Sequence, residues 1–260
     1  MGVIHGAASL RRSQRGEQDH PFGVSPYRQG VGPRRRGLTR SLSFEEQSGI
    51  GAVILSHRHF DHVRDLLPLG IGLLNSGKTV DIYAIEDTVK FVSEKLLDGT
   101  LYPNFLEFPS PETPVFRMHA VEFFKEFDVL GYKAMAVPVP HAVPAAGFLI
   151  TSGDTQLFYT GDTGKGLSDA WPHVSPNVLL TEVTFGNGDP DRAAVAGHLT
   201  PNLLEETLND FKNLKGYIPR VIVAHMNPSW EATVRRELAE VEQRLGLDIQ
   251  ISEADMVLDI

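Results

Sequence analysis

The chain contains no cysteine among its 260 residues. This absence excludes disulfide bonds and thiolate metal ligands, and it is compatible with a reducing compartment. The sequence also lacks any apolar run that approaches the about 18 residues of a membrane span. Its first residues do not show the charged-then-apolar pattern of a signal peptide. We therefore expect a cytoplasmic protein that has no membrane partner.

Positive charge is scarce outside the first 40 residues. The net charge is −9, yet residues 1–40 hold eight Arg and only two acidic residues, Glu17 and Asp19. The remainder therefore carries 16 basic and 31 acidic residues. Such an acidic body disfavours long nucleic acid, whose binding needs many Lys and Arg contacts to phosphates. A small phosphodiester is the expected substrate partner, with nucleic acid kept as an alternative, and a homodimer is compatible with the sequence.

Residues 1–43 show no strand or helix period and are rich in Arg, Gly, Ser, Gln and Pro, so we interpret them as an irregular basic segment. Order begins at residue 44, and residues 44–260 are expected to form one hydrolase domain. The hydrophobic pattern predicts helices at 61–74 and 88–97, the second with Asp87 as N-cap, and two more after Thr200 and Ser229. Strands are predicted at 52–55, 80–85, 115–118, 132–137, 146–151, 156–160, 177–182, 221–224, 248–251 and 256–260.

Four residues of metal-ligand type stand within six positions, directly after the apolar run 52–55. They are His57, His59, Asp61 and His62. In an extended segment alternate side chains share one side, so His57 and His59 point the same way, and the turn that follows brings Asp61 and His62 to a neighbouring position. Imidazole and carboxylate bind zinc and similar ions, and two adjacent ions suit hydrolysis. The alternative is a solvated, histidine-rich turn, which this density of ligands disfavours.

The pattern HxHxDH formed by these four residues resembles the signature of the metallo-β-lactamase superfamily. That family also has a later His, an Asp and a last His, each after a strand, and His141, Asp162 and His225 occur in that order. The resemblance implies a four-layer α/β/β/α sandwich. It places His57, His59 and His141 on one metal, and Asp61, His62 and His225 on the other, with Asp162 bridging the two. The N-terminal strands of the family are not recognisable in residues 1–43, so they are degenerate here or the gene start differs.

Several segments around the expected ligands resemble the class II 3′,5′-cyclic-nucleotide phosphodiesterases and their bacterial relatives. They include residues 140–148, 161–164, 181–187, 197–201 and 223–228. Within this resemblance Glu182 and His198 form a candidate pair in which the carboxylate orients an imidazole that acts as proton donor. A strand-end charge and a surface histidine before a helix N-cap are the plainer interpretation. Phe60, Phe148 and Phe185 are candidates to stack on a base, and Asn187 is a candidate phosphate or sugar contact.

The function expected from these residues is phosphodiester hydrolysis by a metal-bridging hydroxide, most of all on 3′,5′-cyclic nucleotides. Asp61, Asp162, Glu182 and His198 are the expected catalytic residues. Two divalent ions are expected, zinc in preference to manganese or iron. The alternatives are an RNA-processing nuclease like ribonuclease Z, a thioesterase or lactonase of the same fold, and a metal-binding protein that has lost activity.

Overall fold

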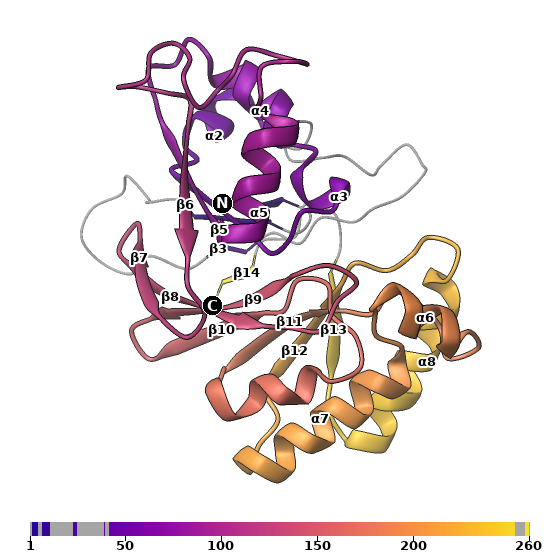
Figure 1. Cartoon of the computed structure of the whole chain (residues 1–260). Coiled ribbons are helices and arrows are strands. Elements are labelled where there is room, and N and C mark those ends of the chain that lie inside the picture. Colours follow the sequence, from indigo (N-terminus) through magenta and orange to yellow (C-terminus); the bar gives the residue numbers. More distant parts are fainter. Residues whose placement is uncertain are drawn as a thin grey trace.

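Two β-sheets lie face to face at the centre of the computed structural model, and helices cover the outer side of each (Figure 1). The structure describes residues 2–4, 7–10, 23–24, 39, 42–252 and 258–259. The upper half of the view holds the elements up to β6, and the lower half holds the elements from β7 to β13 (Figure 1). The layers are therefore helix, sheet, sheet and helix.

The first sheet has five strands in the order β1-β2-β4-β5-β6. β4, β5 and β6 run parallel, whereas β2 pairs with β4 antiparallel. The strands are β1 (Gly2–Ile4), β2 (Ala7–Leu10), β4 (Ala52–Leu55), β5 (Val80–Ile85) and β6 (Phe116–Val121).

The second sheet has seven strands in the order β13-β12-β11-β10-β9-β8-β7. β10 to β13 run parallel, and β7 to β10 form an antiparallel meander. The strands are β7 (Glu126–Val129), β8 (Tyr132–Pro138), β9 (Ala146–Ser152), β10 (Thr155–Tyr159), β11 (Val178–Glu182), β12 (Arg220–Ala224) and β13 (Ile249–Ile251). A separate pair joins β3 (Gly23–Val24) to β14 (Leu258–Asp259).

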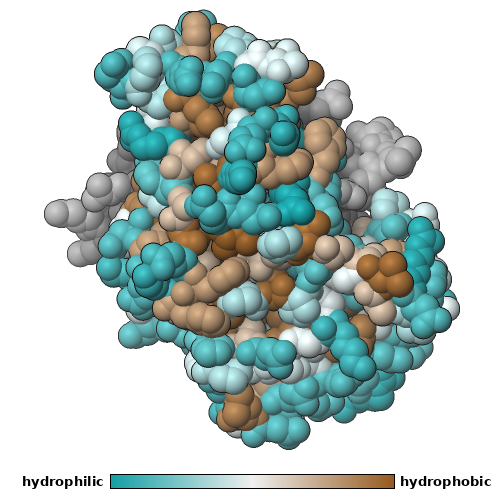
Figure 2. All heavy atoms as spheres, in the orientation of Figure 1, coloured by the Kyte–Doolittle hydropathy of each residue, from teal (hydrophilic) through white to brown (hydrophobic). Residues whose placement is uncertain are grey.

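The helices cover the two outer faces. They are α2 (Phe44–Ser48), α3 (Phe60–Val63), α4 (Leu66–Leu73), α5 (Glu86–Phe91), the π-helix η1 (Val92–Leu96), the 3₁₀ helix η2 (Leu167–His173), α6 (Pro190–Ala196), α7 (Pro201–Lys215) and α8 (Glu231–Leu245). Figure 2 shows a largely hydrophilic surface over the lower helical layer, as expected for amphipathic helices that face water on one side.

Strand β4 shows how alternate side chains of one strand pack into different layers of the fold. Ala52 and Ile54 are buried between the two sheets, while Val53 and Leu55 are buried against the first helical layer. Both faces of the strand are therefore apolar, and its carboxyl end is held rigidly between the layers. The segment that follows, with His57 and His59, starts from this fixed point.

Helix α7 begins where the sequence predicts. Thr200 caps it by accepting a hydrogen bond from the Leu203 amide, and Gly216, at φ 83°, ends it. Its apolar stripe packs on the second sheet, and burial of each such side chain stabilises the fold by about 1.5–3 kcal/mol. The buried members of the stripe include Leu204, Leu208 and Phe211.

The interpretation of residues 1–43 as irregular does not anticipate β1, β2 and β3. β2 pairs with β4 along its whole length, from Ala7 opposite Leu55 to Leu10 opposite Ala52. N-terminal strands of the first sheet are thus present, although the composition of residues 1–43 does not predict them. Most of the remaining residues before Leu42 lie outside the described part of the chain, and the domain boundary at residue 44 stays a prediction.

Two predicted helices differ from the structure. The helix at 61–74 is split into α3 and α4, because Pro68 has no amide to bond to the Arg64 carbonyl and a continuous helix would lose that bond. The helix at 88–97 begins earlier, at Glu86, and continues as η1. Asp87 is not its N-cap, because the helix begins one residue earlier and Ile85 stands at the N-cap position. The Asp87 carboxylate pairs with the Arg58 guanidinium. Arg58 thereby ties the segment between His57 and His59 to α5.

Other elements were not predicted, among them α2, α6, η2 and β7. The Pro-containing segment before β6 lacks helix and strand over residues 102–115. None of the helices in the described ranges is both long and apolar enough to cross a bilayer.

Candidate metal centre

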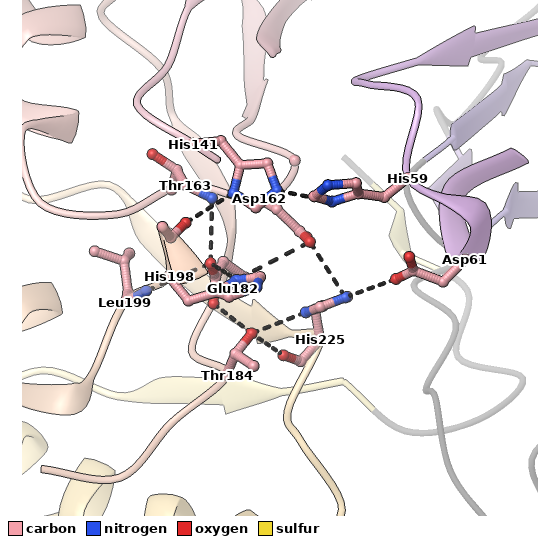
Figure 3. A network of polar contacts seen from close by, with 12 residues as sticks. His59, Asp61, His141, Asp162, Thr163, Glu182, Thr184, His198, Leu199 and His225 are labelled. Atoms are coloured by element: carbon pink, nitrogen blue, oxygen red, sulfur yellow. Dashed lines mark hydrogen bonds and ion pairs between the residues drawn. The ribbon is translucent and has the colours of Figure 1, made fainter. Parts of the chain in front are cut away.

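The candidate ligands all lie where strands end at one edge of the sandwich (Figure 3). His57 and His59 follow β4, and Asp61 and His62 belong to α3. Three more follow strands of the second sheet, namely His141 after β8, Asp162 after β10 and His225 after β12. The structure therefore brings together residues from both halves of the chain, as the sequence predicts.

A first group consists of three imidazoles whose nitrogens converge. The Nδ1 atom of His59 lies 2.9 Å from His57 Nε2 and 3.1 Å from His141 Nε2. Burial lowers the pKa of all three rings, so they are neutral at pH 7. Neutral imidazole is the form that binds a metal.

The tautomer of His141 is fixed by the backbone. Its Nδ1–H donates to the Gly197 carbonyl at 2.8 Å, so its Nε2 lone pair faces the other two rings. Gly197 has φ 70°, and a Cβ atom there would lie 2.7 Å from the Ala142 amide nitrogen. Glycine is thus needed for this close approach.

A second group consists of Asp61, His62, Asp162 and His225, each offering a ligand atom within 4.8 Å of the others. His225 Nε2 lies 3.2 Å from Asp61 Oδ2, and His62 Nε2 lies 3.1 Å from Asp162 Oδ2. Burial opposes the charged form of His62, but the Asp162 carboxylate raises its pKa to about 10. A divalent cation bound to His62 would take the place of that proton.

Asp162 joins the two groups. Its Oδ2 atom is 3.1 Å from His62 Nε2 in the second group and 4.0 Å from His57 Nε2 in the first. Burial favours the neutral acid, but His225 and His62 hold the pKa of Asp162 well below its usual range. An ionised carboxylate between two ligand groups fits the predicted bridging position.

Ser56 supports both groups from behind. Its hydroxyl oxygen lies 3.1 Å from His57 Nδ1 and 3.2 Å from His62 Nδ1. Gly161, at φ 62°, allows this packing, because a Cβ atom there would lie 2.6 Å from Ser56 Cβ. Hydrogen bonds to the outer ring nitrogen fix the orientation of metal-binding histidines.

Glu182 and His198 form the expected pair, next to the second group. His198 Nδ1 lies 2.6 Å from Glu182 Oε1 and 4.0 Å from Asp162 Oδ2. Burial opposes the imidazolium, but the Glu182 carboxylate raises the pKa of His198 to about 9. His198 is therefore protonated at pH 7 in the metal-free chain, as a proton donor must be.

Sequence reasoning missed Thr184. Its buried hydroxyl lies between Glu182 and His225, at 2.6 Å from Glu182 Oε2 and 2.9 Å from His225 Nδ1. The only signal in the sequence is its position two residues after Glu182. Its neighbour His225 lies 41 residues away, so no local pattern reveals the contact.

The four residues that the sequence suggests as substrate contacts lie in different surroundings. Phe148 is wholly buried between the sheets and cannot stack on a substrate. Phe60 is 70% exposed between two ligand residues. Phe185 is buried, with its ring 5.7 Å from that of His198. Asn187 accepts a hydrogen bond from the Asn202 amide at 2.9 Å, so its side chain oxygen supports the start of α7.

The donor set fits a pair of divalent ions. Five imidazoles and two carboxylates converge from rigid strand ends, and the outer nitrogens of four rings have hydroxyl or carbonyl partners. Nitrogen atoms of neutral rings that face one another at about 3 Å repel unless a cation or a proton lies between them. The arrangement therefore supports divalent metal binding.

Two curated relatives of the chain are ribonucleases by name. Endoribonuclease YSH1 of Yarrowia lipolytica is 26% identical over 176 residues, which cover 61% of this chain and 21% of that protein. Ribonuclease TTHA0252 of Thermus thermophilus is 29% identical over 170 residues, covering 62% of this chain and 38% of that protein. The chain thus spans well under half the length of these relatives. Their names agree with the predicted hydrolase class.

Solved structures share the fold. The crystal structure of unliganded yeast PDE1 has a TM-score of 0.71 at 16% identity, over 84% of this chain and 70% of that one. The short form of human tRNase Z has a TM-score of 0.61 at 16% identity, over 99% of this chain and 98% of that one. The predicted metallo-β-lactamase-type sandwich is confirmed.

The sequence model of one family covers most of the chain. It is described as "Beta-lactamase superfamily domain" and matches residues 28–226, a range that includes all seven candidate ligands. The matched segment begins ahead of residue 44, in the part that composition alone marks as irregular. The chain belongs to the family of beta-lactamase superfamily domains.

Proposed function

We propose that this protein is a metal-dependent phosphodiesterase that hydrolyses small phosphodiesters, with 3′,5′-cyclic nucleotides as the preferred substrates. The observation that carries the proposal is the Glu182–His198 pair, which lies 4.0 Å from the carboxylate between the two ligand groups. A buried, protonated imidazole at this distance serves a reaction whose leaving group needs a proton.

The residues of the chain have separate tasks. Glu182 accepts from His198 Nδ1, which leaves the Nε2–H of that ring free to donate to the departing ribose oxygen. Asp162 keeps its charge in the buried centre and lies between both ligand groups. Ser56 and the Gly197 carbonyl hold the rings of the first group in their orientation.

The proposed ligand sets are those expected from the sequence. His57, His59 and His141 would hold one ion, and Asp61, His62 and His225 the other, with Asp162 shared. When bound, two divalent ions would stabilise negative charge on the phosphoryl oxygens and lower the pKa of the attacking water. Zinc suits this set of imidazoles and carboxylates best, and manganese or iron is also accepted by such ligands.

A phosphodiester fits the acid pair better than a thioester does. A ribose alkoxide is a poor leaving group and needs a proton, whereas a thiolate leaves without one. The acidic body of the protein, with 31 acidic and 16 basic residues after residue 40, favours a small substrate over a long polyanion.

RNA processing is the second candidate, and the names of the curated relatives favour it. The match covers 21% of one relative and 38% of the other. The two candidates differ in the size of the substrate, since both break a phosphodiester bond.

A direct comparison of substrates tests the proposal. Protein reconstituted with zinc or manganese should hydrolyse 3′,5′-cyclic AMP and bis(p-nitrophenyl) phosphate faster than a structured precursor RNA. The Asp162→Ala variant is the control for contaminating nuclease. Cleavage of the RNA with no turnover of cyclic AMP would move the assignment to the second candidate. Hydrolysis of thioesters alone would overturn both.

A cytoplasmic location and a homodimer remain predictions from the sequence. Size-exclusion chromatography with light scattering measures the mass of the particle in solution and tests the dimer.

A further inference from the structure

We propose that Thr184 is a positioning residue whose single hydroxyl joins the second ligand group to the acid pair. The inference rests on the proposed function for the role of His198, but not for the metal-binding part. Thr184 stands just beyond β11, is only 5% exposed, and faces Glu182 and His225 together (Figure 3).

The donors and acceptors around this hydroxyl can be assigned by counting protons. Glu182 Oε2 at 2.6 Å and the His225 carbonyl at 2.8 Å only accept, so the single Thr184 proton serves them. The third neighbour, His225 Nδ1 at 2.9 Å, must then donate its own proton to the Thr184 oxygen. His225 is thereby held as the Nδ1–H tautomer.

With a proton on Nδ1, the Nε2 atom of His225, 3.2 Å from Asp61 Oδ2, is the atom that would bind an ion in the second ligand group. Thr184 also restrains the backbone there. His225 has φ 50°, a conformation that non-glycine residues rarely adopt, and the Asn227 amide donates to the Thr184 carbonyl at 3.1 Å. Both the ring and the backbone of this ligand are thus fixed from Thr184.

The other end of the connection is the Glu182 carboxylate. Its Oε1 accepts from His198 Nδ1 at 2.6 Å and from the Thr163 amide at 3.1 Å, while its Oε2 accepts from Thr184. A continuous chain therefore runs from His225 through Thr184 and Glu182 to His198. It holds the ring of a candidate ligand at one end and the ring of the acid pair at the other, so loss of the hydroxyl should affect metal affinity and proton donation together.

Metal titration against a competing chelator tests the first consequence without any substrate. In the full chain, Thr184→Val replaces the hydroxyl by a methyl group of similar size. It should weaken the binding of one of two zinc ions, the one held by the second ligand group, by about 10- to 100-fold, the usual effect of losing such a partner. Binding of the other ion should be unaffected, and Thr184→Ser should behave like the unmodified protein.

Thr181→Val is the matched control. Thr181 lies on β11, three residues before Thr184, and is also buried, but its hydroxyl bonds to Thr160 rather than to a residue of the centre. Equal metal affinity in Thr184→Val and the unmodified protein would overturn the proposal. So would a loss in Thr184→Val that Thr181→Val reproduces, since that would reflect a buried hydroxyl in general.

A second measurement keeps the proposal testable if Thr184→Val does not fold. Nitrogen-15 chemical shifts of the His225 ring in the metal-free full chain should report a proton on Nδ1. A proton on Nε2 with Nδ1 bare would overturn the assignment. Neither measurement requires the phosphodiesterase activity, so failure of the substrate proposal and failure of this one are distinguishable.

Discussion

His198 Nδ1 and Glu182 Oε1 lie 2.6 Å apart in a buried contact. The carboxylate accepts from one ring nitrogen, and the other ring nitrogen is left to meet a substrate. Glu182 is itself held by the Thr163 amide, so the pair is positioned by the backbone of the loop that carries Asp162. This contact is the basis for assigning proton donation to His198.

Replacement of His198 should matter most for poor leaving groups. His198→Ala is expected to slow hydrolysis of a cyclic nucleotide about 10²- to 10⁴-fold, the range for a lost acid catalyst. The same variant should slow bis(p-nitrophenyl) phosphate much less, because p-nitrophenolate leaves without a proton. Steady-state rates on both substrates measure the difference. Equal losses on the two substrates would show that His198 binds phosphate or supports the fold.

Phe60 should contribute to nucleotide binding but not to stability. Its side chain is 70% exposed between two ligand residues, and stacking on a base is worth about 1–3 kcal/mol. Phe60→Ala should therefore weaken the binding of a nucleotide product about 5- to 100-fold, measured as an inhibition constant. Phe44→Ala is the control, since Phe44 is 62% exposed on α2. Identical inhibition constants in the two variants would remove Phe60 from the site.

His57, His59, Asp61 and His62 could be read from the sequence, because four ligand-type residues stand close together after an apolar run that the structure shows as strand β4. The other three candidates, His141, Asp162 and His225, came from the resemblance to the metallo-β-lactamase superfamily, and each follows a strand in the structure. Periodicity also located α7, whose cap and buried stripe are local features.

Contacts between distant segments were out of reach. The hydroxyls of Ser56 and Thr184 support ligand rings, but serine and threonine occur throughout the chain and only the fold selects these two. Asp87 was predicted to cap a helix, and the sequence does not reveal that Arg58 lies within reach of it. Strand β2 was missed for the same reason, since its pairing with β4 joins residues more than 40 positions apart.

The stability of the metal-free protein should fall as the pH rises above neutrality. The pKa of His198 is about 9 in the fold, above its ordinary value of 6.5, so the folded chain holds a proton that the unfolded chain has lost. The stabilisation that this proton gives to the folded state is complete below pH 6.5 and is lost as the pH rises through 9. His62, at about 10, acts in the same direction.

Thermal unfolding of chelator-treated protein between pH 6 and pH 10 measures this effect. His198→Gln cannot take up the proton, and it should reduce the decline in melting temperature over that interval. The same decline in His198→Gln and in the unmodified protein would show that His198 does not hold an extra proton in the fold.

The proposed chemistry depends most on a centre that holds two divalent ions. Elemental analysis of protein dialysed after reconstitution with zinc measures the number of ions per chain. We expect close to two in the unmodified protein, one in His59→Ala, and a marked loss in Asp162→Ala, whose carboxylate lies between both groups. Fewer than one ion per chain in the unmodified protein, or two ions retained in Asp162→Ala, would contradict that expectation.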